Sequence, residues 1–205
     1  MDTAFLVTTM TTILLAFIGY IATYINNLRT SQLTEQLERV NKQLNELYGP
    51  LFAISQANHI SWQAFRAKYR PGRAFFGEGN PPTEDELEIW RLWIRTVFMP
   101  NNTRMYEAII SKSDLLIEEK MPDCLLLFCA HISAYQSILK RWEDKDFTEH
   151  TSIVNYPGQE LLSYCQNSFQ ALKTEQAQLL GKKTSLRSRI KAAILSYTKA
   201  KGGSK

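Results

Sequence analysis

The sequence predicts an all-α membrane protein: one N-terminal transmembrane helix that continues into a short coiled-coil-like stalk, followed by a bundle of about five or six helices. An uncharged apolar segment comes first, apolar residues recur every three to four positions through most of the remaining chain, and strand signals are nearly absent. The chain has 205 residues, of which 44% are hydrophobic and 21% charged, and its net charge is +4. This composition excludes a disordered or collagen-like chain.

The predicted anchor is the segment 4–25, AFLVTTMTTILLAFIGYIATYI, whose 22 residues include no charge. As a helix it would span ~33 Å, whereas the hydrocarbon layer of a bilayer is ~30 Å thick. A cleaved signal peptide is the alternative, but the segment lacks a basic start, a short apolar core and a small-residue cleavage site. No Lys or Arg precedes it, and Arg29, Arg39 and Lys42 follow it. We therefore expect a single-pass protein of the inner (plasma) membrane, with its N-terminus outside and the rest of the chain cytoplasmic.

Small residues form one face of this anchor, which we place at residues 1–27. At 100° per residue, an arc of about 80° holds Thr8, Thr12, Ala16, Gly19 and Thr23. Such a stripe lets a second helix approach closely, so it predicts a helix–helix contact in the membrane with another protein or a second copy of the chain. The alternative is that each threonine hydroxyl bonds only to the carbonyl four residues earlier in its own helix.

The predicted stalk covers residues 28–49. Its apolar seam has the 4-3-4-3 spacing of coiled-coil core positions: Leu33, Leu37, Val40, Leu44 and Leu47. The seam could pack against a partner's helix or against the chain's own domain, and the sequence leaves both alternatives open. If the helix continues directly from the membrane, the seam and the small-residue stripe face the same side.

Residues 50–181 form the predicted helical bundle domain, in which prolines mark the expected breaks. We expect helices over 51–69, 84–98, 102–120, 124–142 and 159–181. Thr83 and Glu86 have the spacing of a capping box, and Gly181 fits a C-terminal cap.

The helix expected over 84–98 is apolar on nearly all sides. Such a helix lies in the middle of a core or is covered by a partner. We favour the core, and Trp90, Trp93 and Phe98 are the candidate partner face in the alternative.

Residues 182–205 are predicted to be a basic amphipathic C-terminal helix and tail. From residue 176 onward there are eight Lys or Arg residues and no acidic residue. For a chain anchored in the bilayer we expect an anionic lipid surface as the partner, bound by Lys182, Lys183, Arg187, Arg189 and Lys191. A protein partner and a solvated tail are alternatives. Nucleic acid is not expected, because no nucleic-acid-binding motif accompanies the charges.

No motif predicts catalysis, a cofactor or a metal. The three cysteines form no CxxC pair, and buried thiols in odd number suit a reducing cytosol. His59, His131 and His150 are scattered, without the HExxH or ExxH spacing of metal sites. Nucleotide-binding and nucleophile motifs are also absent. We therefore expect a non-enzymatic protein with no catalytic, cofactor-binding or metal-ligating residues.

The strings LNELYGPL, WRLWIRTVFMPNN, MPDCLLLFCAH and ILKRW resemble a group of uncharacterised bacterial membrane proteins. These proteins have one N-terminal span and a cytoplasmic all-helical domain, and the resemblance covers residues 44–181. It implies this architecture and a bacterial origin, and it implies no activity.

The expected function is that of a cytoplasm-facing adaptor or accessory subunit, anchored by one span and binding other membrane proteins. The alternative is a membrane-perturbing effector, a toxin or defence component, that acts by oligomerisation of its span. The threonine-rich span could line a pore, but a single uncharged span is poor support for one.

Overall fold

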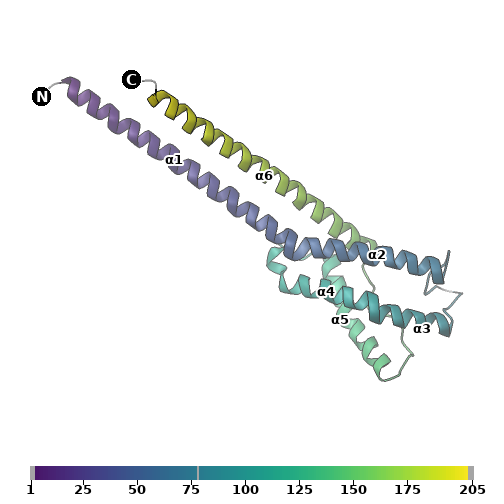
Figure 1. Cartoon of the computed structure of the whole chain (residues 1–205). Helices are drawn as coiled ribbons and strands as arrows, with labels where there is room; N and C mark the ends of the chain where they lie inside the picture. The colour runs from purple at the N-terminus through teal and green to yellow at the C-terminus, as the bar shows by residue number, and fades with distance from the viewer. Residues whose placement is uncertain (1–2, 78, 203–205) are drawn as a thin grey trace. The chain divides into compact units, whose positions relative to one another are not determined.

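The computed structural model describes the backbone of residues 3–77 and 79–202, and their side chains except those of 183, 184 and 186–202 (Figure 1). Within these residues every regular element is a helix, apart from one isolated β-bridge between Gly77 and Asn80. The all-α prediction is therefore confirmed.

The described elements join into four continuous helices, and the expected bundle of five or six is wrong. The first consists of α1 (Thr3–Gln43), the π-turn η1 (Leu44–Tyr48) and α2 (Gly49–Tyr69). The second consists of α3 (Glu84–Trp93), the π-turn η2 (Ile94–Phe98) and α4 (Met99–Ser111). The short 3-10 helix η3 (Ser113–Leu115) follows, and then come α5 (Asp123–Glu143) and α6 (Gly158–Gly202).

Two prolines that we expected to break helices instead follow π-turns. Proline has no N–H, and inside an α-helix its ring collides with the carbonyl four residues earlier. Before Pro50 the Gly49 N–H bonds to the Leu44 carbonyl, and before Pro100 the Met99 N–H bonds to the Ile94 carbonyl. These bonds reach back five residues, so the wider turn moves the preceding carbonyls away from their α-helical positions. The chain thus accommodates each proline without ending the helix.

The other helix ends show where local and long-range signals compete. The capping box is confirmed: Glu86 N–H donates to Thr83 Oγ1 over 3.3 Å, and Thr83 N–H donates to Glu86 Oε2 over 2.8 Å. The expected cap at Gly181 is wrong, because α6 continues through it to Gly202. A glycine inside a helix costs only about 1 kcal/mol relative to alanine, so its neighbours can carry the helix past it.

The helix expected over 102–120 ends earlier, at Ser111. The following residues leave the helix and bury Leu115 and Leu116. Two contacts hold them there: Gln43 Nε2 donates to the Leu115 carbonyl over 2.9 Å, and Ile117 N–H donates to the Tyr48 hydroxyl over 3.0 Å. Tertiary contacts therefore override the local helical pattern.

The contacts between Cα atoms divide the chain into two compact units, residues 42–173 and residues 1–41 with 174–205. We call residues 42–173 the helical unit. In it, α4 contacts both α2 and α5 (Figure 1). Phe52 of α2 stacks on Phe169 of α6, with ring centroids 4.6 Å apart. Fully buried side chains form its core: Leu47, Leu51, Phe65, Met105, Ile109, Leu125, Phe128 and Leu161.

In the other unit, α1 is long and apolar enough to cross a membrane. The mean hydropathy of its apolar stretch is 2.0. None of the residues in this apolar stretch is buried by the rest of the chain. Near the C-terminal end of α1, Asn41 Oδ1 accepts from Gln176 Nε2 of α6 over 2.6 Å. Leu37 and Val40 of α1 and Leu179 of α6 are buried.

The close backbone approach at η1 predicts that Gly49→Ala destabilises the protein. A Cβ at this position would collide with the Leu44 carbonyl oxygen, which is backbone and cannot rotate away. We expect a loss of about 1–3 kcal/mol in the free energy of unfolding, as for other overpacked sites. Thermal unfolding followed by circular dichroism measures it.

Gly181→Ala is the matched control, because Gly181 is also helical and a Cβ there meets nothing within 4 Å. This variant should be neutral or slightly more stable, since alanine favours a helix. Equal unfolding temperatures for both variants would contradict the close approach of the Leu44 carbonyl to Gly49.

Candidate functional site

A pocket with a volume of about 620 Å³ lies inside the helical unit. Its walls come from α2, the helix α3–η2–α4, α5 and the start of α6, together with residues of the loop 144–157, which we call the pocket loop. Small-molecule sites in proteins typically have ~300–1,000 Å³. The pocket is therefore of the size that holds such a ligand.

Aromatic side chains form much of the pocket wall. Trp62 lies edge-to-face with Trp90 and with Phe98, at centroid distances of 5.9 and 6.2 Å. Trp90 and Phe98 are only 8% and 7% exposed, so two of the three residues of the candidate partner face are mostly covered by the chain itself. The third, Trp93, is half-buried with its ring 5.3 Å from Phe65. Trp90 and Phe98 are part of the pocket lining.

Hydrogen bonds link three asparagine side chains of α2 and α4 at the pocket. Asn101 Nδ2 donates to Asn58 Oδ1, and Asn58 Nδ2 donates to Asn102 Oδ1, each over 2.8 Å. Asn58 and Asn102 are each 6% exposed and both line the pocket. In the part of the chain that the structure describes, Asn102 Nδ2 has no hydrogen-bond partner, and it is not a fully enclosed atom. It is thus a free donor at the pocket.

His131 of α5 supplies a free acceptor. Its Nδ1 lies 2.6 Å from the Val154 carbonyl oxygen in the pocket loop. A carbonyl only accepts, so Nδ1 carries the proton and the Nε2 of the neutral ring is an acceptor. Burial lowers the pKa of His131, and the Val154 carbonyl opposes this shift only in part. Among the described residues no donor reaches Nε2, which is not fully enclosed.

The pocket loop has no regular secondary structure, and side chains from the helices hold its carbonyls. Trp90 Nε1 and the Tyr135 hydroxyl both donate to the His150 carbonyl, over 3.0 and 2.9 Å. Trp142 Nε1 donates to the Glu149 carbonyl over 2.8 Å. Together with the bond from His131 to Val154, these contacts fix the loop in position at the pocket.

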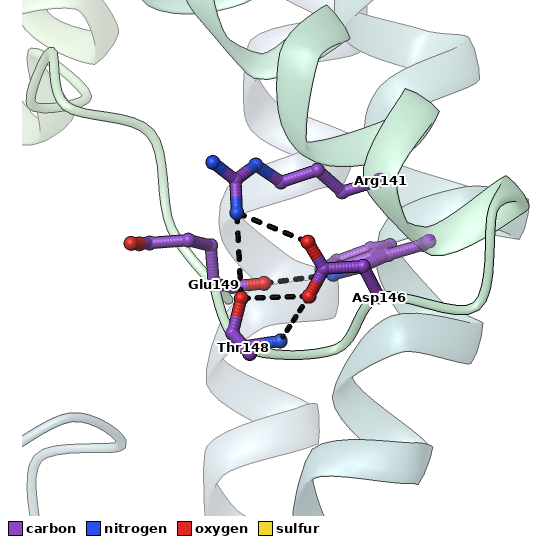
Figure 2. Close-up of polar contacts among 5 residues, drawn as sticks. Arg141, Asp146, Thr148 and Glu149 are labelled. Carbon is purple, nitrogen blue, oxygen red and sulfur yellow. Dashed lines mark hydrogen bonds and ion pairs between the residues drawn. The ribbon is translucent and has the colours of Figure 1, made fainter.

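The first turn of the pocket loop is organised around Asp146 (Figure 2). Its carboxylate accepts from the Thr148 hydroxyl over 2.7 Å, from the Thr148 N–H over 3.1 Å and from Arg141 Nη1 over 3.1 Å. The bonds from Thr148, with the charge of Arg141, lower the pKa of Asp146. Lys145, just before it, has the left-handed φ of 62° that reverses the chain after α5.

The pocket lining carries no charged side chain. Among the described residues that form it there is no Asp, Glu, Lys or Arg. Burial raises the pKa of Tyr135, so its hydroxyl stays protonated, and the lowered pKa keeps His131 neutral at pH 7. The arrangement can bind through aromatic surface and neutral hydrogen-bonding groups.

Groups that could do covalent or metal chemistry are not gathered in the helical unit. Cys124 and Cys165 are buried and Cys129 is half-buried, and burial raises the pKa of each thiol, that of Cys165 to about 12. A protonated thiol is a poor nucleophile. Within the residues described, no three His, Cys, Asp or Glu side chains are placed to hold a metal ion.

The residues that the sequence singled out in α1 are not part of the pocket lining. The hydroxyls of Thr8, Thr12 and Thr23 each donate to the carbonyl four residues earlier, over 2.8–2.9 Å. These bonds are the ones that the intrahelical alternative expects, and they leave a contact with a partner helix as a prediction. Ala16 is exposed, and an added Cβ at Gly19 would meet nothing within 4 Å.

The seam and the basic tail have different outcomes. Leu44 and Leu47 are buried in the helical unit, so this part of the seam packs on the chain's own domain. Leu37 and Val40 are also buried, and Leu33 is half-buried. In the tail, Lys182 is exposed. The side chains of the remaining predicted lipid-binding residues lie outside the described residues: Lys183, Arg187, Arg189 and Lys191.

The pocket itself was not predicted from the sequence. Asn58, Asn102 and His131 occur at helical spacing among apolar residues, and such polar positions are the signal that could have indicated a lined cavity. Which helices bring them together depends on the fold.

No protein-family model, curated protein or solved structure matches the chain.

The network around Asp146 predicts that Asp146→Ala loosens the pocket loop without unfolding the helices. We expect chymotrypsin to cleave after Phe147 several-fold faster in this variant, because the turn loses the acceptor for Thr148 and Arg141. Asp144→Ala is the control, since in the described residues the side chain of Asp144 pairs only with Lys140, at the C-cap of α5. Equal cleavage of the two variants would contradict a loop held by Asp146.

Proposed function

We propose that the chain is a non-enzymatic adaptor or accessory subunit, anchored in the inner (plasma) membrane by one N-terminal span with the rest of the chain in the cytoplasm. The observation that carries this proposal is the contrast along α1–η1–α2. The apolar part of α1 is entirely exposed, whereas Leu44, Leu47 and Tyr48 are buried in the helical unit. An apolar helix that the chain does not cover is stable in a bilayer or against another protein.

The proposed orientation follows from the charges that flank the span. Arg29, Arg39 and Lys42 come after it, and only Asp2 precedes it as a charged side chain. Positive flanks stay on the cytoplasmic side during insertion. The free thiols of the helical unit suit the same compartment, because disulfides are rare in a reducing cytosol.

The proposed partner contact is the small-residue stripe of α1. Because the threonine hydroxyls are satisfied within the helix, a partner would gain from close backbone packing and dispersion at Ala16 and Gly19. This contact could join a second copy of the chain or another membrane protein. The basic tail, with Lys182 exposed, is proposed to bind the anionic lipid surface beside the span.

The stripe predicts that Gly19→Ile reduces association in the membrane. The added side chain occupies the space that a partner helix needs, so photo-crosslinking from a probe at position 16 should fall severalfold. Full-length protein in its own membrane is the sample, and the masses of the crosslinked products identify the partner.

Ile21→Ala is the matched control, because residue 21 lies about 200° from residue 19 around the helix. If both variants crosslink like the parent, the stripe is not a contact surface. If the only product is a large homo-oligomer and expression is lethal, the effector alternative replaces the adaptor.

A further inference from the structure

We propose that the pocket of the helical unit binds a neutral, ring-containing small molecule that pairs with Asn102 Nδ2 and His131 Nε2. This inference goes beyond the adaptor function and does not depend on it. The span and its partner are tested by crosslinking in the membrane, and the pocket is tested by ligand binding, so either can fail alone.

The charge of the ligand follows from the lining. Among the described residues, the lining offers no cation to pair with a phosphate or carboxylate and no anion to pair with an amine. Moving an ionised group from water into such a site costs free energy, and no ion pair with the lining offsets this cost. Nucleotides, phosphorylated metabolites and carboxylic acids are thereby excluded as good ligands.

The shape of the ligand follows from the aromatic wall. The ring centroid of Trp62 lies 5.9 Å from that of Trp90 and 6.2 Å from that of Phe98, and Tyr135 lines the same pocket. Aromatic rings pack favourably against other rings in offset or edge-to-face geometry. A flat ring system therefore gains contacts here that a flexible polar chain would not.

The polar groups of the ligand follow from two atoms of the lining that have no partner in the described residues. Asn102 Nδ2 on α4 is a donor, and His131 Nε2 on α5 is an acceptor. A purely apolar ligand would cover both atoms and leave them unpaired, which costs binding free energy. A ligand with one acceptor and one donor satisfies both.

The site is also prepared for binding before a ligand arrives. His131 is held by the Val154 carbonyl, and Asn102 is held by Asn58, so neither side chain has to be ordered on binding. The pocket loop is held by three further side-chain donors from the helices. Preorganisation of this kind increases affinity because less conformational entropy is lost.

The test uses full-length protein in nanodiscs and 2-naphthol as the probe, a neutral ring system whose hydroxyl both donates and accepts. Equilibrium dialysis at pH 7 against empty nanodiscs should show saturable binding of about one probe per chain. Naphthalene-2-sulfonate, the anionic counterpart, should bind at least ~10-fold more weakly. 2-Methoxynaphthalene, which cannot donate, should bind about 5–10-fold more weakly, because His131 Nε2 is left unpaired.

Two substitutions to tryptophan on α6 test whether the probe binds in the pocket. Gln159 is exposed and lines the pocket, so Gln159→Trp should block the pocket and abolish saturable binding. Asn167 is exposed two turns further along and does not line it, so Asn167→Trp should bind like the parent. Thr151→Trp, on the exposed pocket loop, replaces Gln159→Trp if circular dichroism shows that the latter does not fold.

Four results would overturn the proposal. The first two are binding to the parent that does not saturate above empty nanodiscs and equal binding of the sulfonate. The others are equal binding of 2-methoxynaphthalene and equal binding by the blocked and control variants. Loss of binding in the blocked variant alone, with crosslinking of the span unchanged, supports the pocket independently of the adaptor function.

Discussion

The helical unit depends on the burial of one side chain, Trp90. Trp90 is 8% exposed, and the ring centroids of Trp62, Phe65 and Phe75 lie within 6.0 Å of its own. These contacts join α2, the loop that follows it, and α3. The indole N–H is directed elsewhere and donates to the His150 carbonyl. A single residue therefore packs the aromatic core and also holds the loop that completes the pocket, as expected for tryptophan, whose large apolar ring carries one polar group.

The buried polar groups of the helical unit are also held by hydrogen bonds. Most buried polar atoms are paired in native structures. Here the side chains of Asn58, Asn101 and Asn102 bond to one another, and His131 bonds to the Val154 carbonyl. Asn102 Nδ2 and His131 Nε2 are among the polar atoms of the pocket lining that have no partner in the described residues. The described lining is uncharged, and burial raises the pKa of the thiols of the helical unit.

Much of the fold could be predicted from local sequence, and the site could not. The apolar α1, the capping box at Thr83 and the all-α class depend on residues close in the chain. The helix breaks expected at Pro50 and Pro100 were wrong because a π-turn can absorb a proline, and the early end of α4 depends on contacts of Leu115 and Ile117 with residues about 70 positions away. Asn58, Asn102 and His131 come from three helices, and no spacing in one segment shows that they meet.

A small molecule bound in the proposed pocket can be detected by native mass spectrometry of full-length protein, released from membrane nanodiscs after extraction from its own membrane. We expect one bound small molecule on the parent and on Asn167→Trp, and none on Gln159→Trp, in which the pocket is blocked. The same bound mass on all three proteins, or no bound molecule on the parent, would overturn the proposed pocket.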